Sequence, residues 1–167
     1  MKILYNTLLI LFIVSLTAFA QAPFAPWAKL SSDAPKDISS RKYPVPTKDE
    51  VGIQPYPGAY ISSVSAPSED TVKYDKEVLP FVILVSTDRP EQVISFYKKK
   101  LTAANGWNYN EEFKTFVKGP QGSSLTGFVP SVAIRDENGQ NFDLVYVDQS
   151  LKNRLKTRVE ITYKPTK

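Results

Sequence analysis

The sequence contains no cysteine and no histidine among its 167 residues. Without cysteine the chain can form no disulfide, and it has no thiolate for catalysis, for a lipid anchor or for a zinc site. Without histidine it lacks the side chain whose unperturbed pKa best suits proton transfer near neutral pH. These absences exclude a Ser-His-Asp triad and any metal site built on histidine or cysteine. Catalysis would have to use carboxylates, lysine, tyrosine, serine or threonine, as in hydrolases that act with two carboxylates.

An excess of charge of either sign is also missing. The formal net charge is +4, from 21 basic and 17 acidic residues. A nucleic-acid-binding domain usually concentrates more positive charge on one face, so the composition does not favour a nucleic-acid partner. The chain is 42% hydrophobic and 12% aromatic, which is enough material for one ordinary core. We therefore expect a single folded domain.

The N-terminus has the pattern of a secretory signal peptide. Lys2 precedes an apolar run from Leu8 to Val14, and Ala18-Phe19-Ala20 has the small-x-small pattern that signal peptidase cleaves. This predicts a signal peptide over residues 1–20 and a periplasmic or secreted mature protein. The alternative is an uncleaved N-terminal membrane anchor, because the apolar stretch approaches the roughly 20 residues that span a bilayer.

Proline marks the next segment. Seven of the 13 prolines fall between residues 21 and 57, among polar residues and few large apolar ones. This composition predicts a largely irregular linker over residues 21–54. The folded domain is expected over residues 55–167, beginning with a type II turn at Pro57-Gly58, in which Gly58 takes the positive φ angle.

One segment has the period of an amphipathic helix. Asp88 is predicted to cap its N-terminus, with Pro90 in the first turn and Glu91 three residues after the cap. Asn105-Gly106 is predicted to end it. Apolar side chains recur at spacings of three and four residues, so one face should lie on a sheet. These side chains are Val93, Ile94, Phe96, Tyr97, Leu101 and Ala104.

The remaining elements have strand character. The predicted strands cover residues 59–64, 81–85, 112–117, 131–136, 141–147 and 158–164. Five consecutive apolar residues from Phe81 to Val85 indicate a central strand buried on both faces. Asn138-Gly139 favours the type I′ turn of a hairpin.

Together these patterns predict an α+β fold with a curved antiparallel sheet of about six strands, in the order β-β-α-β-β-β-β. One helix can cover only one face of that sheet. Because the strand at 81–85 is apolar on both faces, we expect the sheet to curve over its second face in a monomer. A homodimer is the alternative.

A resemblance supports export. Uncharacterised exported bacterial proteins share a pattern that this chain resembles, and its elements here are Tyr56-Pro57-Gly58-Ala59, Asp88-x-Pro90-Glu91-x-Val93, Phe96-Tyr97 and Gly106-Trp107. The resemblance implies an exported α+β domain. It carries over no activity, cofactor or site residue.

The sequence identifies no catalytic, cofactor-binding or metal-binding residue. The acidic segment 136–143 has glycine at its fourth position, whereas a calcium loop of the EF-hand type needs glycine at the sixth. The glycine-rich segment 119–124 is followed by no helix that could hold a phosphate. No pattern brings two carboxylates to a catalytic separation.

The C-terminal region is basic. Its cations are a candidate contact for an anionic surface, such as membrane headgroups or acidic polysaccharide. They are Lys152, Arg154, Lys156, Arg158 and Lys164. Without an amphipathic helix to insert, such membrane contact would be peripheral. The alternative is a solvated strand face whose lysines discourage edge-to-edge pairing.

Four aromatic residues are candidates for lining a ligand pocket, and burial in the core is their alternative role. They are Tyr60, Trp107, Tyr109 and Tyr146. The function that fits these patterns is an exported, non-catalytic binding or structural domain with an unknown ligand, facing a protein or the envelope surface. The alternative is a hydrolase or other enzyme that uses carboxylate or Tyr/Lys chemistry.

Overall fold

The computed structural model describes residues 45–65, 78–119, 127–137 and 149–165. Within these ranges, six strands form one antiparallel sheet in the order β1-β2-β6-β5-β4-β3. The strands are β1 (Tyr60–Ser65), β2 (Phe81–Ser86), β3 (Trp107–Asn110), β4 (Thr115–Lys118), β5 (Ser131–Asp136) and β6 (Thr157–Thr162). The helices are α1 (Lys48–Val51) and α2 (Pro90–Lys100), with 3-10 helices η3 (Ala103–Asn105) and η4 (Gln149–Arg154). The predicted α+β class, with one main helix and a curved antiparallel sheet of six strands, is confirmed.

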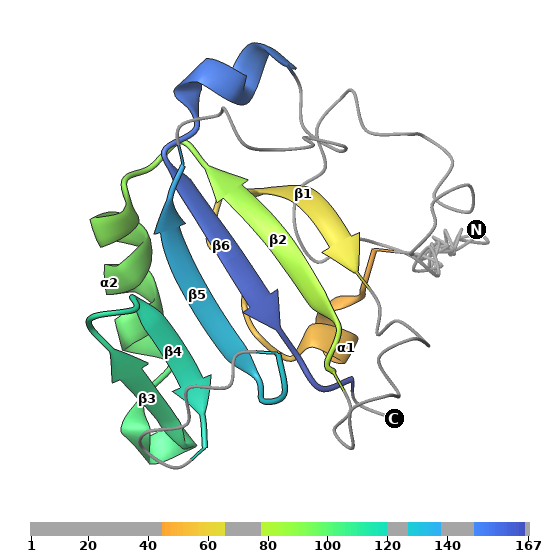
Figure 1. The fold of residues 1–167 in the computed structure, drawn as a ribbon, viewed down its shortest axis with the longest axis vertical. Coiled ribbons are helices and arrows are strands. Elements are labelled where there is room, and N and C mark those ends of the chain that lie inside the picture. The colour runs from red at the N-terminus through yellow and green to blue at the C-terminus, as the bar shows by residue number, and fades with distance from the viewer. Residues whose placement is uncertain (1–44, 66–77, 120–126, 138–148, 166–167) are drawn as a thin grey trace, which may run out of the picture.

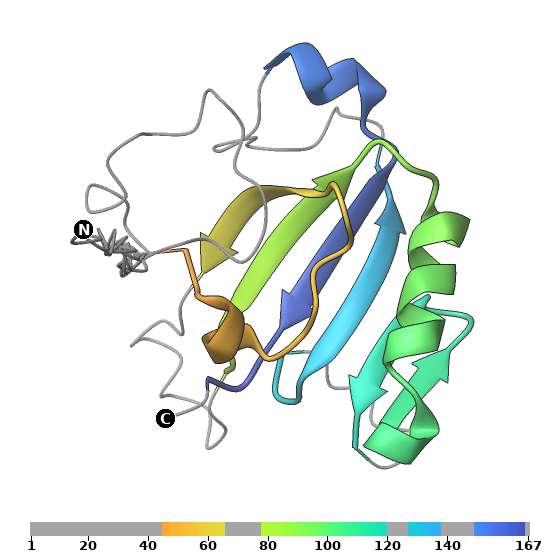
Figure 2. The same cartoon turned by 180° about the vertical axis from the view of Figure 1, so that it is seen from behind.

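The sheet is curved, and α1 and α2 lie on the same face of it (Figures 1 and 2). Alternate residues of the inner strands, such as Leu84 of β2 and Val159 of β6, are fully buried with Val93 and Tyr97 of α2. This alternation is the two-residue period of a strand, so each inner strand contributes half of its side chains to this core. Among the described residues, no helix is long and apolar enough to cross a membrane.

Strand β2 is an inner strand with both faces buried, as predicted. It pairs with β1 on one side and β6 on the other. On the face away from the helices, Val85 is buried against Leu151 and Leu155, with Tyr60 packed beside them. The segment η4 to Leu155 therefore covers this end of the second face from within the chain.

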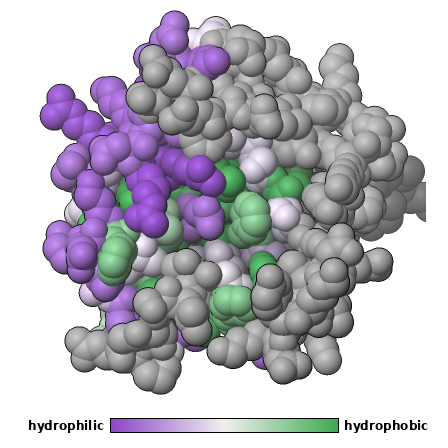
Figure 3. All heavy atoms as spheres, viewed as in Figure 1, coloured by the Kyte–Doolittle hydropathy of each residue, from purple (hydrophilic) through white to green (hydrophobic). Residues whose placement is uncertain are grey.

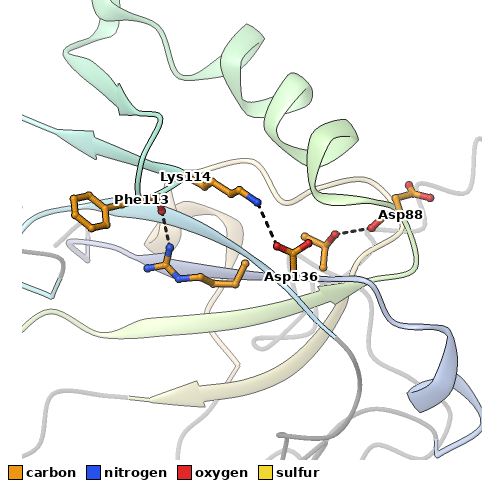
Figure 4. Close-up of polar contacts among 6 residues, drawn as sticks. Asp88, Phe113, Lys114 and Asp136 are labelled. Carbon is orange, nitrogen blue, oxygen red and sulfur yellow. Dashed lines mark hydrogen bonds and ion pairs between the residues drawn. The ribbon is translucent and has the colours of Figure 1, made fainter.

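The N-cap of helix α2 lies one residue later than predicted, and the prediction that Asp88 caps the helix is wrong. The N-cap is Arg89, whose N–H donates to Oε1 of Gln92 at 3.1 Å. Asp88 is tied to the end of the sheet instead, because its carbonyl accepts from the Thr157 hydroxyl at 2.6 Å (Figure 4). Its carboxylate accepts from the Tyr56 hydroxyl at 2.8 Å.

Helix α2 ends at Lys100, and the chain continues through η3 to Gly106, whose φ of 77° marks a left-handed residue. The predicted stop at Asn105-Gly106 therefore ends the 3-10 turn rather than the α-helix. The next residues form β3, which the sequence did not predict, because a four-residue strand is too short to show a clear period.

A tight turn joins β3 to β4. The strand predicted over residues 112–117 therefore begins only at Thr115. The Asn110 side chain accepts from the Phe113 N–H at 3.0 Å, and Lys114 adopts a φ of 46°. Lys114 also pairs with Asp136 of β5 at 3.2 Å (Figure 4). The predicted strand 141–147 and the Asn138-Gly139 turn lie outside the described residues.

Residues 45–54 differ from the irregular linker expected there. Helix α1 has a capping box, in which Thr47 Oγ1 accepts from the Glu50 N–H and Glu50 Oε2 accepts from the Thr47 N–H. Val45, Val51 and Ile53 are buried in the main core. The turn predicted after them is confirmed: Gly58 has a φ of 77°, and the N–H of the next residue donates to the Tyr56 carbonyl at 3.1 Å.

Candidate anion-binding pocket

A hollow of about 650 Å³ lies where the loop after α1, the end of α2, the start of β3 and the segment after β6 meet. This volume is within the range of roughly 300–1,000 Å³ that small-molecule sites usually have. We call it the lysine pocket, and its characteristic lining residues are Lys100, Lys118, Lys164, Trp107, Tyr163 and Ile53.

The three lysines reach the pocket from three different elements. Lys100 is the last residue of α2, Lys118 is the last residue of β4, and Lys164 follows β6. All three are exposed, and none forms an ion pair with a described carboxylate. Among the described residues that line the pocket there is no aspartate or glutamate. Three lysines around one pocket favour a positive local potential, which an anion would relieve.

The floor of the pocket is apolar and aromatic. Trp107 and Tyr163 are only 7% and 8% exposed, and Ile53 is buried beside them in the main core. Trp107 is held by its N–H, which donates to the Thr102 carbonyl at 3.1 Å. Tyr163 is held by its N–H, which donates to the carbonyl of Pro80 at 3.0 Å. The floor is therefore set by backbone contacts before any ligand arrives.

Burial first, and the negative charge of Glu50 second, raise the pKa of Tyr163 to about 12. Removing the proton would place a phenolate in a poorly solvated site near a carboxylate. The Tyr163 hydroxyl therefore keeps its proton at neutral pH. It can donate a hydrogen bond, but it is poorly suited to act as a general base.

The pocket unites two residues that the sequence singled out for different reasons. Trp107 was a candidate pocket aromatic, and Lys164 was a candidate contact for an anionic surface. The lysines at 100 and 118 were not predicted. Lys100 belongs to a run of three lysines that suits the negative end of a helix, and Lys118 ends a short strand. No local pattern indicates that residues so far apart in sequence converge.

The other basic candidates lie elsewhere. Lys152 and Arg154 lie in η4, and Lys156 directly precedes β6. Lys164 lies beyond the other end of β6, so about 20 Å of strand separates it from these three residues. Arg158 bonds Glu160 at 3.1 Å on the sheet face away from the helices.

Strand β6 pairs with β2 and with β5, so it is an inner strand. The interpretation that its lysines discourage edge pairing is therefore wrong.

In the space-filling view, hydrophobic side chains gather near the middle of the sheet face, and hydrophilic ones lie along the side where α2 and the β3–β4 hairpin are (Figure 3).

Two further aromatic candidates, Tyr60 and Tyr109, are not among the residues that line the lysine pocket. Tyr60 lies on β1 and Tyr109 on β3, which are the two edge strands of the sheet. The Tyr109 ring lies 4.5 Å from that of Phe116, and the Lys98 ammonium lies 4.4 Å above it. Tyr146 lies outside the described residues. Among the residues that are described, no group of three or more acidic side chains is arranged to hold a metal ion.

No protein-family model, curated protein or solved structure matches the chain. The resemblance to exported bacterial proteins therefore stays a prediction from the sequence pattern.

Proposed function

We propose that this protein is an exported, non-catalytic binding domain that takes an anionic ligand in the lysine pocket. The observation that carries the proposal is that Lys100, Lys118 and Lys164 line one pocket over an apolar floor, with no carboxylate among the described lining residues. Export rests on the signal-peptide pattern of residues 1–20. A monomer is consistent with this role, because the segment ending at Leu155 covers Val85 on the second sheet face from within the chain.

The pocket suits binding better than catalysis. In a chain without histidine or cysteine, acid–base chemistry would use carboxylate, lysine or tyrosine side chains. The part of the lining that the structure describes contains no carboxylate pair, and Tyr163 stays protonated at neutral pH. The lysines and the floor together offer positive charge beside an apolar surface, which suits a ligand with an acidic group next to an apolar part.

The charge contribution to binding can be bounded. An exposed lysine that meets an anion contributes up to about 1 kcal/mol, and salt screens this interaction. Three such contacts therefore contribute at most about 3 kcal/mol, or roughly a hundredfold in affinity. We expect a ligand with at least two negative charges and an affinity that falls as salt increases.

Calorimetric titration with three probes tests the proposal: oligoglutamate, oligogalacturonate and tripolyphosphate. Lys118→Glu reverses one charge in the pocket, and it should weaken binding of the preferred probe by about tenfold, which corresponds to about 1.4 kcal/mol. Arg154→Glu makes the same change of charge on an exposed residue of η4 and is the matched control. It should change the affinity by less than about twofold, since charges farther apart than a Debye length are screened.

Equal losses in the two variants would show that only net charge matters and would contradict a pocket site. Failure of all three probes to bind the wild-type protein would contradict the proposed function as a whole.

A further inference from the structure

The outer margin of the sheet next to the lysine pocket is strand β3. It is the last strand in the sheet and pairs only with β4 (Figures 1 and 2). Trp107 lies opposite Lys118, and the Gly119 N–H donates to the Gly106 carbonyl at 3.1 Å. In an antiparallel pair, residues that bond the neighbouring strand alternate with residues whose backbone groups face away. Here the backbone groups of Trp107 and Tyr109 face away from β4.

Three of the four outward groups have no hydrogen-bond partner among the described residues. The Trp107 N–H donates to Thr102, whereas the Trp107 carbonyl and the N–H and carbonyl of Tyr109 have no hydrogen-bond partner among the described residues. Such an edge can accept a further strand, whose backbone supplies affinity while side-chain sites supply specificity. A four-residue edge strand alone is common in proteins. The distinguishing feature here is what lies at its beginning.

The edge leads directly into the lysine pocket. Trp107 is both the first residue of β3 and part of the pocket floor, and its cross-strand neighbour Lys118 is one of the three lysines. An extended chain advances about 3.3 Å per residue, so a peptide that pairs with Tyr109 reaches Trp107 within two residues. The edge and the pocket therefore form one continuous surface.

The direction of pairing decides which end of the peptide enters the pocket. Every strand pair in this sheet is antiparallel. Strand β3 runs away from the pocket, from Trp107 to Asn110. A strand added antiparallel to it runs toward the pocket and delivers its C-terminal end there. Because three lysines line the pocket, this end is complementary in charge when it is acidic.

We propose that the ligand of the lysine pocket is an extended peptide that pairs antiparallel with the outer edge of β3 and places an acidic C-terminal end, with its terminal carboxylate, among Lys100, Lys118 and Lys164. This inference rests on the proposed function, since it names the class of ligand for the same pocket.

Backbone-modified peptides test the strand pairing without altering the protein. The parent probe is the peptide Val-Thr-Val-Glu-Glu with a free C-terminus. One variant is N-methylated at the residue whose N–H faces the β3 carbonyls, and its matched control is N-methylated at the neighbouring residue, whose N–H points away from the sheet. The first should bind at least tenfold more weakly than the parent, and the control should bind within about twofold.

Two further measurements examine the two ends of the surface. Hydrogen exchange of the Tyr109 amide should slow at least tenfold when the parent peptide is bound, because that N–H becomes hydrogen-bonded. Amidation of the peptide C-terminus should weaken binding at least fivefold, and Lys118→Glu should reduce this dependence on the terminal carboxylate.

The outcomes separate this inference from the proposed function. If oligoglutamate or another anion binds with sensitivity to Lys118→Glu, but the two N-methylated peptides bind alike and the Tyr109 amide is not protected, strand addition is overturned and the pocket remains. If the peptide slows hydrogen exchange of the Tyr109 amide, but its affinity changes neither on amidation nor in Lys118→Glu, the placement of the acidic end is overturned. If neither the peptide nor any anionic probe binds, both proposals fail.

Discussion

Replacing Ile53 with alanine tests whether residues before Pro55 belong to the folded domain. Ile53 is 7% exposed and belongs to the main core, and it also forms part of the floor of the lysine pocket. In a linker, this substitution would change the free energy of unfolding by less than about 0.5 kcal/mol. In a packed core, an Ile→Ala change costs about 2–5 kcal/mol, since it removes buried methylene groups and leaves a cavity.

Because Ile53 borders an open hollow, into which neighbouring groups can relax, we expect a cost near 2 kcal/mol. For a domain of this size the dependence of unfolding on urea is about 1.5 kcal/mol/M, so the urea midpoint should fall by about 1.3 M. The control is Gln54→Ala, which alters an exposed neighbour and should leave the midpoint nearly unchanged. A shift in Ile53→Ala as small as in the control would refute the assignment of residues 45–54 to the core.

Further outcomes follow from the core and from the tyrosines. Leu84→Ala, at a fully buried position of β2, should lower the free energy of unfolding by about 2–5 kcal/mol in urea titrations, whereas Ser95→Ala on the exposed side of α2 should have little effect. Tyr56→Phe removes a hydrogen bond of 2.8 Å to the Asp88 carboxylate and should cost about 1 kcal/mol in the same assay; a neutral result would show that water replaces this contact. The pKa values of Tyr56 and Tyr163 are raised to about 12, by burial first and by nearby carboxylates second. Since the folded state disfavours the phenolate, their contribution to stability is complete below about pH 10 and is lost as pH rises through about 12. Replacing both with phenylalanine should flatten this alkaline decline, and an unchanged decline would contradict the assignment.

The fold was predictable where a local period was long enough to detect. Helix α2 repeats apolar residues over three turns, and β2 is a continuous apolar run, so both were located within a few residues. Strand β3 was missed because four residues carry too little pattern. Helix α1 was also missed, although its capping box, Thr47 to Glu50, is visible in the sequence, because the surrounding prolines favoured an irregular segment.

The candidate site was less predictable than the fold. Trp107 and Lys164 were identified as chemically suitable residues, but their proximity depends on the pairing of β4 with β3 and on the chain that follows β6. Lys118 reaches the pocket only because of the register that places it opposite Trp107. The contacts of Asp88 also depend on a residue that is distant in the sequence. The local sequence favoured a helix cap, but the Asp88 carboxylate accepts a hydrogen bond from the hydroxyl of Tyr56 instead.

The resonance of the Trp107 indole N–H gives the most direct test of the central claim that the lysine pocket is the ligand site. The chain has two tryptophans, so the other, Trp27, serves as an internal reference. In a nuclear magnetic resonance titration with oligoglutamate or the acidic pentapeptide, the Trp107 signal should move saturably in the wild-type protein and in Arg154→Glu. In Lys118→Glu it should move only at about tenfold higher ligand concentration. Calorimetric binding that leaves the Trp107 signal unmoved, or that moves it identically in Lys118→Glu, would contradict the account.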